Sequence, residues 1–465
     1  MSFFIRNSRG AAPKRKLNGQ SKQFSDDQQS KVRKGSKKKF GPRDDDSIAS
    51  SDEEFAEERL EKKQDLSESS DEDRETAQEK RLRLAKKYLT EIEEEEKDRA
   101  EFEQGAVARR LQEEYLEEKG RLRKTVASNY TGHSDLLELR CKDHKDSITC
   151  LCLSSDGRFV YSGSKDGTLV KWLLADRTKL KVLRGKRKAE EGIKNVRCIA
   201  ISTDGKFLVV GDGASKGIKV FSGEDFKLLK ELQGHRGAVT GLVFRRDTHT
   251  LYSASEDRSV KVWNLDDMAY VESLFGHQNG VTSIDALSRE RAITSGGYDR
   301  TIRIWKIVEE SQLIYNGHSG SVDVVKLINE ENFLSCGDDG QLCVWGSLKK
   351  KPLCSVAEAH GKDESNGQPM WISSIATLLN TDLVASAGSR DGAVRLWKCG
   401  ESFKSLTMLF EVKLIGFVNT MAFTPDGNNL VVGVGQEHKM GRWWRIPEAK
   451  NRIVVIPLVQ NKVKK

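Results

Sequence analysis

Histidine, serine and aspartate recur in the C-terminal two-thirds of the chain at spacings that first suggest catalysis. His235, Ser253 and Asp257 form one such set. A serine, a histidine and an aspartate held together can make a hydroxyl nucleophile for acyl transfer. However, Trp263 follows the aspartate by six residues, and the whole set recurs along the chain. Repetition at a regular period is typical of a structural repeat and not of an active site.

The period of the repeat is 40–52 residues, and each copy ends on a tryptophan in a short β-branched segment such as SVKVW or TIRIW. A buried serine hydroxyl that joins the histidine to the indole N–H, with the aspartate on the histidine, satisfies all these polar groups. The set is therefore expected to be structural and not catalytic. The predicted relays comprise His235, Ser253, Asp257 and Trp263; His277, Ser295, Asp299 and Trp305; and His318, Ser335, Asp339 and Trp345.

Two degenerate copies, over residues 196–221 and 418–446, bring the number of repeats to seven. Four short strands per repeat and a G-H…W-D pattern are typical of a WD-repeat propeller. In the sixth copy Ala387 stands four residues before Asp391, where serine is expected, so that relay is predicted to be incomplete.

The predicted fold class is all-β, a seven-bladed WD-repeat β-propeller over residues 132–460. A propeller has to close into a ring to remove its sheet edges. Residues 136–140 and 453–458 are short apolar segments at the two ends of the repeat array. We expect one or both to complete the last blade, with a basic tail at 461–465 beyond it.

Other catalytic and metal-binding patterns are missing from the sequence. It has no G-x-x-x-x-G-K-[ST], G-x-S-x-G or H-E-x-x-H motif, and none of its 8 cysteines forms C-x-x-C. We expect no enzyme activity, no metal and no cofactor. No run of 18 apolar residues and no secretory leader is found, so a reducing compartment with free thiols is expected.

Charge is strongly segregated in the N-terminal part. Residues 1–43 carry 13 Lys or Arg against 2 Asp, whereas residues 44–104 carry 24 acidic against 11 basic residues. Such a composition predicts that residues 1–74 form a disordered tail, basic and then acidic. Serines followed by acids near 50 and 67–70 fit phosphorylation. The basic clusters fit a nuclear-import signal or a generic solvated tail: Lys14, Arg15, Lys16, Lys37, Lys38 and Lys39.

A helical arm is expected over residues 75–131. Apolar residues recur at helical spacing from Leu82 to Ile92 and from Val107 to Tyr115. We predict two helices, at about 76–98 and 100–126. Either the arm docks on a partner or on the propeller, or it is a pair of marginal solvated helices.

Four arginines lie at turns expected on one face of the propeller: Arg236, Arg258, Arg300 and Arg390. Guanidinium groups form bidentate hydrogen bonds with phosphate and stack on bases, so these residues are candidates for RNA or partner binding. The alternative is that arginine beside the aspartate is an ordinary turn residue of the repeat.

Aromatic residues and one irregular loop supply the other candidates. Trp371 and Phe417 precede the inner strands of blades 6 and 7, where an aromatic ring is either exposed beside the channel or packed in the core. Segment 435–445 replaces the expected aspartate turn, and such departures mark functional sites. We expect one of its tryptophans to fill the blade position and name His438, Arg442 and Trp443 as candidates. A basic loop at 186–188 is either a second cluster or solvated.

Several segments outside the repeat signature resemble the WD-repeat family of the U3 small nucleolar ribonucleoprotein. They are ETAQEKRLRLAKKYL (75–89), VFRRDTHTLYSASEDRSVKVWN (243–264), YVESLFGHQNGV (270–281), RTIRIWKIVEESQLIY (300–315), MWISSIATLLNTDLVA (370–385) and GVGQEHKMGRWWRI (433–446).

The resemblance covers most of residues 75–458. It implies a non-catalytic protein of the nucleus and nucleolus that binds the box B/C region of U3 small nucleolar RNA. It also implies action with the kink-turn-binding protein of box C/D particles. In that setting the family scaffolds the small-subunit processome for precursor ribosomal RNA processing and 18S rRNA maturation.

Two other functions are compatible with a propeller, because fold alone does not fix function. One is a peptide- or histone-binding adaptor, which predicts an acidic or apolar groove beside the helix and not a basic face. The other is a substrate receptor of a ubiquitin ligase, which often carries W-D-x-R after a blade. Here the corresponding tails are WNLD, WKIV and WKCG.

Overall fold

The computed structural model describes residues 77–97, 106–139, 142–185, 192–363, 367–441 and 444–461. The predicted tail 1–74 with its basic clusters, the loop 186–188, Arg442 and Trp443 lie outside these ranges. The chain divides into two units, Met1–Glu94 and Glu95–Lys465. No helix among the described residues is long and apolar enough to span a membrane.

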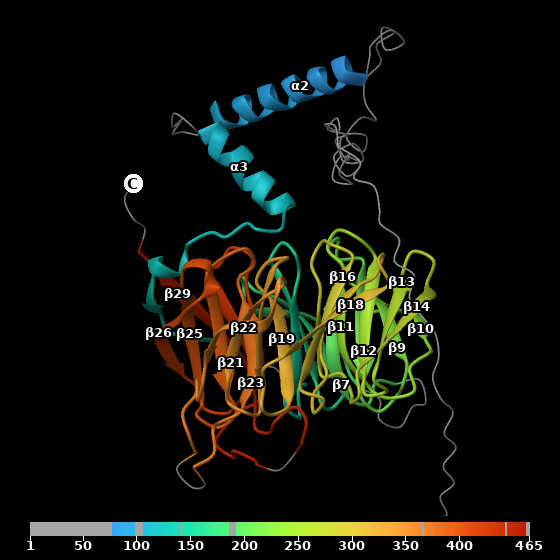
Figure 1. The fold of residues 1–465 in the computed structure, drawn as a ribbon. Helices are drawn as coiled ribbons and strands as arrows, with labels where there is room; N and C mark the ends of the chain where they lie inside the picture. The colour runs from blue at the N-terminus through green and yellow to red at the C-terminus, as the bar shows by residue number, and fades with distance from the viewer. Residues whose placement is uncertain are drawn as a thin grey trace, which may run out of the picture. The chain divides into compact units, whose positions relative to one another are not determined.

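The second unit is a seven-bladed propeller in which each blade is an antiparallel sheet (Figure 1). Blade 1 holds β3 Ile148–Leu153, β4 Phe159–Ser164, β5 Leu169–Leu173 and β6 Thr178–Leu183; blade 2 holds β7 Val196–Ile201, β8 Phe207–Asp212, β9 Ile218–Ser222 and β10 Leu228–Leu232; blade 3 holds β11 Val239–Phe244, β12 Thr250–Ser255, β13 Ser259–Asn264 and β14 Ala269–Phe275; blade 4 holds β15 Ser283–Asp285, β16 Arg291–Ser295, β17 Thr301–Lys306 and β18 Ser311–Asn316.

The remaining three blades continue the same order. Blade 5 holds β19 Val322–Leu327, β20 Asn332–Gly337, β21 Leu342–Gly346 and β22 Lys349–Val356; blade 6 holds β23 Ile372–Thr377, β24 Leu383–Gly388, β25 Ala393–Cys399 and β26 Leu406–Lys413; blade 7 holds β27 Phe417–Phe423, β28 Asn429–Gly435 and β29 Arg452–Gln460.

Both chain ends close the ring, as the sequence predicted. The two short strands β1 Tyr130–His133 and β2 Leu137–Leu139 pair with β29, in the order β1-β29-β28-β27. The inner strand β27 then contacts β3 of blade 1. Because the first and last parts of the array share one sheet, β29 is not left as an unpaired edge strand of blade 7.

Hydrogen bonds between neighbouring inner strands run around the central channel. The hydroxyls of Thr149, Thr240 and Thr282 donate to main-chain carbonyls of the next blade at 2.6–2.7 Å. Ser373 and the amide of Asn419 do the same from blades 6 and 7, at 2.7 and 2.8 Å. Because these bonds cross the blade boundaries, they help to fix the angular position of successive blades.

The hydrophobic core lies between blades. One buried cluster joins Val209 and Val220 of blade 2 to Leu251 and Trp263 of blade 3. Side chains alternate across each strand, so one face of a blade packs on the blade before it and the other on the blade after it. The relay tryptophans therefore seal blade boundaries.

The arm differs from the sequence prediction. Its helices are α2 Ala77–Lys97 and α3 Ala106–Glu118, so the second ends eight residues before the expected position 126. Gly120 has a positive φ of 64°, and a Cβ there would lie 2.4 Å from Glu330 of blade 5. Close approach of the backbone to the propeller thus ends the helix.

Residues 121–127 cross the propeller face that carries the turns between first and second strands. Arg121 forms an ion pair with Glu331 of blade 5 at 2.9 Å. The carboxylate of Asp382 in blade 6 is fully buried and accepts the amides of Val126 and Ala127, at 2.7 and 2.9 Å. This segment fastens the chain to blades 5 and 6 before it enters the closing sheet.

Candidate functional site

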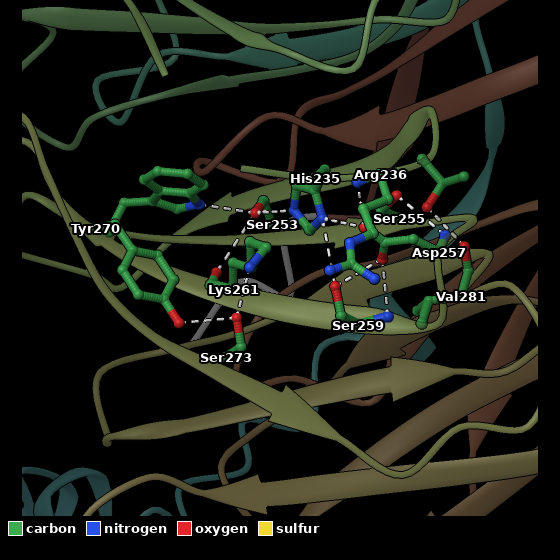
Figure 2. Close-up of polar contacts among 12 residues, drawn as sticks. His235, Arg236, Ser253, Ser255, Asp257, Ser259, Lys261, Tyr270, Ser273 and Val281 are labelled. Atoms are coloured by element: carbon green, nitrogen blue, oxygen red, sulfur yellow. Dashed lines mark hydrogen bonds and ion pairs between the residues drawn. The ribbon is translucent and has the colours of Figure 1, made fainter. Parts of the chain in front are cut away.

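The relay of blade 3 shows what the repeated polar residues do (Figure 2). His235 Nε2 lies 2.7 Å from Ser253 Oγ, and the indole N–H of Trp263 donates to the same oxygen at 2.8 Å. His235 Nδ1 lies 3.0 Å from Asp257. The hydroxyl is enclosed and already bonded on both sides, so it cannot approach a substrate.

Asp257 also organises the turn above it. The amides of Arg236 and Ser259 donate to its two oxygens, at 2.8 and 2.9 Å. Burial would raise the pKa of Asp257, but the hydrogen bonds from His235, Ser259 and these amides outweigh burial and lower it. The carboxylate is thus a permanent anchor for the surface turns on either side.

Two of the predicted relay assignments are wrong by one residue. In blade 4 His277 Nε2 and the indole of Trp305 meet Thr294 Oγ1, at 2.7 and 2.8 Å, and not Ser295. The Ser295 hydroxyl instead lies 2.8 Å from Thr282 Oγ1. The turn between Thr294 and Asp299 is one residue longer than in blade 3, which moves the inward position back by one.

Blade 6 has a turn lengthened in the same way, and the prediction for its relay is also wrong by one residue. Ser386, beside Ala387, binds His360 Nε2 at 2.7 Å and the indole of Trp397 at 2.8 Å, so this relay is complete. Blade 5 keeps the predicted set, with Ser335 2.7 Å from His318 and 2.8 Å from Trp345. Among the described residues no three His, Cys, Asp or Glu side chains are grouped as metal ligands.

The relays hold turns on the face opposite residues 121–127, because second-to-third-strand turns lie at the other end of an antiparallel sheet. Arg236, Arg258 and Arg300 stand on this face at blades 3 and 4, and all three are exposed. We call them the arginine arc. Within the described ranges none of the three is in an ion pair. Their charges are available to a ligand.

An exposed aromatic residue accompanies the arc and was missed by the sequence analysis. Tyr298 lies two residues before Arg300, in the longer turn of blade 4, and 75% of its surface is exposed. The sequence alone could have indicated this exposed ring, because a tyrosine directly before the relay aspartate lies in the surface turn and not in a core strand. A solvent-facing ring beside a free guanidinium is typical of nucleic-acid contact surfaces.

A second group of candidates meets at blades 6 and 7: Trp371, Arg390, His438 and Trp444, which we call the tryptophan cluster. The guanidinium carbon of Arg390 lies 3.7 Å from the ring centre of Trp444. The Trp371 ring lies 5.6 Å from Trp444 and 6.3 Å from His438. Arg390 also pairs with Asp363. Its charge is already satisfied within the protein.

The cluster corrects two more expectations. Phe417 is only 1% exposed and packs against His438, so its ring is core and cannot stack on a ligand. The blade position expected for one tryptophan of the irregular segment is taken by Ile456 of β29, the third strand of blade 7, which pairs with Leu430. In blade 3 the corresponding partner of Leu251 is Trp263.

The described residues between β28 and β29, 436–441 and 444–451, instead form loop segments, and Lys439 among them reaches into the channel. Asn419 holds the first segment, since its amide donates to the carbonyl of Glu437 at 3.0 Å and its oxygen accepts the amide of Lys439 at 2.9 Å. Burial lowers the pKa of His438 to about 3, helped by the charge of Lys439. His438 is therefore neutral and belongs to the packing of the loop.

Lys439 was not among the sequence candidates, yet its side chain reaches into the channel. Its ammonium group donates to the carbonyl of Ser373 at 3.3 Å. Burial raises the pKa of Asp323 to about 6, and the charge of Lys439 limits this increase. Both residues line the channel cavity of about 1070 Å³. A lysine from blade 7 and an aspartate from blade 5 thus face each other inside the channel.

Known protein families and solved structures share this architecture. Six segments match the WD domain, G-beta repeat: residues 136–172, 178–222, 226–264, 269–306, 309–346 and 362–398. The chain is 53% identical to U3 small nucleolar RNA-interacting protein 2 of Homo sapiens over 396 residues, which cover 83% of this chain and 82% of the human protein. The chain belongs to the U3 small nucleolar RNA-interacting protein 2 family.

The family extends to more distant members and to solved structures. Ribosomal RNA-processing protein 9 of Saccharomyces cerevisiae is 25% identical over 448 residues, covering 74% of this chain and 78% of the yeast protein. The solved structure of U3-55K is 49% identical, with a TM-score of 0.67 over 70% of this chain and 100% of that one. The names of these relatives connect the family with U3 small nucleolar RNA and ribosomal RNA processing.

Proposed function

We propose that this protein is a non-catalytic subunit of the U3 small nucleolar ribonucleoprotein. It binds U3 small nucleolar RNA in the box B/C region and acts in the nucleolus. There it contacts the kink-turn-binding protein and other components of the small-subunit processome during 18S rRNA maturation. The observation that carries the proposal is the 53% identity to human U3 small nucleolar RNA-interacting protein 2, which covers 83% of this chain.

The arginine arc is the part of the structure best suited to RNA. Affinity for a phosphate backbone depends on clustered cations that are free to replace counterions. Arg236, Arg258 and Arg300 meet that condition, whereas Arg390 is paired with Asp363 and covered by Trp444. We therefore assign RNA contact first to the arc, and the tryptophan cluster to support of the channel-lining loop.

The peptide-binding adaptor is the second function that a propeller of this kind supports. A peptide would seek the central channel, where a pocket and buried acids are available. Here the chain's own Lys439 faces Asp323 in that channel, and residues 438–440 of the blade 7 loop line it. An inserted peptide side chain would have to displace this loop, which disfavours the adaptor.

Crosslinking in cells followed by sequencing of the bound RNA tests the proposal. We expect strong and localised recovery of U3 RNA with the wild type. The triple variant Arg236→Ala/Arg258→Ala/Arg300→Ala should lose most of it. His438→Ala/Trp444→Ala is the matched control on the other candidate site and should retain it. Absence of U3 enrichment with the wild type would overturn the function and favour the adaptor.

A further inference from the structure

Arg258 and Arg300 have an unusual backbone conformation. Their φ angles are 69° and 59°, in the left-handed region that favours glycine. The residue after the relay aspartate has the same conformation in three other blades, where it is Gly167, Gly340 or Gly392. The turn therefore demands a left-handed residue in every regular blade, and only blades 3 and 4 meet the demand with a large side chain.

Crowding explains why three blades require glycine. A Cβ at Gly167 would lie 2.3 Å from the carbonyl oxygen of Ile193, and one at Gly392 would lie 2.4 Å from that of Leu414. At Arg258 and Arg300 the neighbouring loops leave room for a side chain, which extends to solvent. Room permits a side chain but does not remove the strain of the left-handed backbone.

The fold gains little from these two side chains. Within the described ranges neither guanidinium forms an ion pair, and the charge of Arg300 only partly offsets the burial that raises the pKa of Asp338. A strained arginine at a turn position where three other blades carry glycine indicates a functional constraint. Two long cations on adjacent turns, with Tyr298 between them in sequence, fit an anionic ligand with exposed aromatic rings.

Resting on the proposed function, we propose that Arg258, Arg300 and Tyr298 form a grip on RNA that is retained at the expense of fold stability. The two guanidinium groups bind successive backbone phosphates, which carry no sequence information. Tyr298 stacks on an unpaired base beside them. The grip supplies affinity and orientation, and the choice of U3 RNA over other RNA comes from contacts elsewhere.

The proposal makes stability and binding move in opposite directions. Arg258→Gly and Arg300→Gly relieve the strain, so each should raise the melting temperature by about 1–3 °C. Each should also weaken binding of the full-length chain to a U3 transcript by about three- to tenfold and reduce the salt slope by about one. An unrelated RNA of equal length should lose affinity by the same factor.

Arg177→Gly is the matched control. Arg177 is exposed and has a φ of 56°, but it lies in the turn between β5 and β6, on the opposite face of the propeller. It should gain the same stability and leave both affinities unchanged. Tyr298→Ala should weaken binding by about threefold to tenfold, and Tyr298→Phe should restore it.

The outcomes separate the two proposals. If the wild type shows no preference for the U3 transcript, the proposed function fails. If the wild type prefers the U3 transcript but the two glycine variants bind as the wild type does, with an unchanged salt slope, the grip is wrong. An equal loss of affinity in Arg177→Gly would also overturn it, because the effect would then reflect net charge alone.

Discussion

The arginine arc and the tryptophan cluster lie on the same face of the propeller and differ in how their charges are used. In the arc the guanidinium groups of Arg236, Arg258 and Arg300 face solvent without an ion-pair partner among the described residues. In the cluster Arg390 is paired with Asp363 and stacked on Trp444. The arginines of the arc can exchange counterions for phosphates, whereas the charge of Arg390 is already balanced by Asp363 within the protein.

The comparison teaches that departure from a repeat pattern is not by itself evidence of a binding site. Segment 435–445 breaks the pattern most sharply, and its irregularity is explained by a structural task, the lining of the channel by a loop anchored on Asn419. Arg258 and Arg300 follow the relay aspartate as ordinary members of the repeat, and the sequence offers them only as candidates among four arginines. A left-handed backbone where other blades carry glycine, together with an exposed guanidinium without an ion pair in the described ranges, distinguishes them.

Removing the arc should have the largest effect. We expect Arg236→Ala/Arg258→Ala/Arg300→Ala to weaken binding to a U3 transcript by about 100-fold at moderate salt, since three phosphate contacts are lost. Trp371→Ala/Trp444→Ala should change the affinity less than about twofold. Filter binding or fluorescence anisotropy over a series of salt concentrations measures both. Equal losses in the two variants would mean that the cluster also contacts RNA.

The relays beneath the two regions allow a second test that removes no charge. Thr294→Val in blade 4 and Ser386→Ala in blade 6 each leave an indole N–H and a histidine nitrogen without a partner. Each should lower the free energy of unfolding by about 2–3 kcal/mol, measured by denaturant titration. Only Thr294→Val loosens the turn that carries Arg300, so only it should weaken RNA binding.

Ser295→Ala is the control for the corrected relay of blade 4. It removes the hydroxyl that the sequence pattern selects but leaves Thr294 in place, so it should cost less stability than Thr294→Val. The reverse order would restore the original assignment of Ser295.

Much of the fold follows from the sequence because local rules act alike in every blade. The spacing of His235, Asp257 and Trp263 defines a blade, and seven copies with two apolar end segments define a closed ring. The relay residue of blade 4 was predicted wrongly because the turn has one extra residue. Side chains alternate between the two faces of a strand, so a shift by one residue exchanges Ser295 for Thr294 in the relay. Counting back from Asp299 cannot reveal the length of that turn.

The candidate site was less predictable, because exposure and pairing depend on tertiary contacts. Phe417 and Trp371 have equivalent places in the sequence, yet Phe417 is 1% exposed and Trp371 is only partly buried, beside Trp444. The rings of both residues lie against His438, 6.4 Å from Phe417 and 6.3 Å from Trp371, and Trp371 also packs on Trp444 from the loop of blade 7. No local pattern indicates where a long loop will fold.

The neutral state of His438 gives a pH test of the cluster. Its pKa is about 3 in the folded protein, against about 6.5 for an unfolded histidine, so only the unfolded chain takes up a proton between these values. Stability from this group is full above pH 6.5 and falls as the pH decreases. At pH 5 the loss is about 2 kcal/mol.

His438→Gln should abolish this part of the acid destabilisation. The measurement is the free energy of unfolding at pH 7.5 and pH 5 for both proteins, and the difference between the two pH dependences isolates His438. His144, whose pKa burial lowers to about 4, stays in both proteins and contributes equally. Identical pH dependences would show that His438 is solvated and that the loop is not packed as described.

Trp444→Ala should have the smallest effect and decide what the cluster is for. The ring is 37% exposed, so its removal loses the contacts with Arg390 and Trp371 but little burial. We expect a loss of about 1 kcal/mol in stability. Faster hydrogen exchange should be confined to residues 436–451 and to the turn of Arg390. Unchanged exchange with a large loss of U3 binding would instead make Trp444 a stacking residue and place the tryptophan cluster beside the arginine arc in RNA recognition.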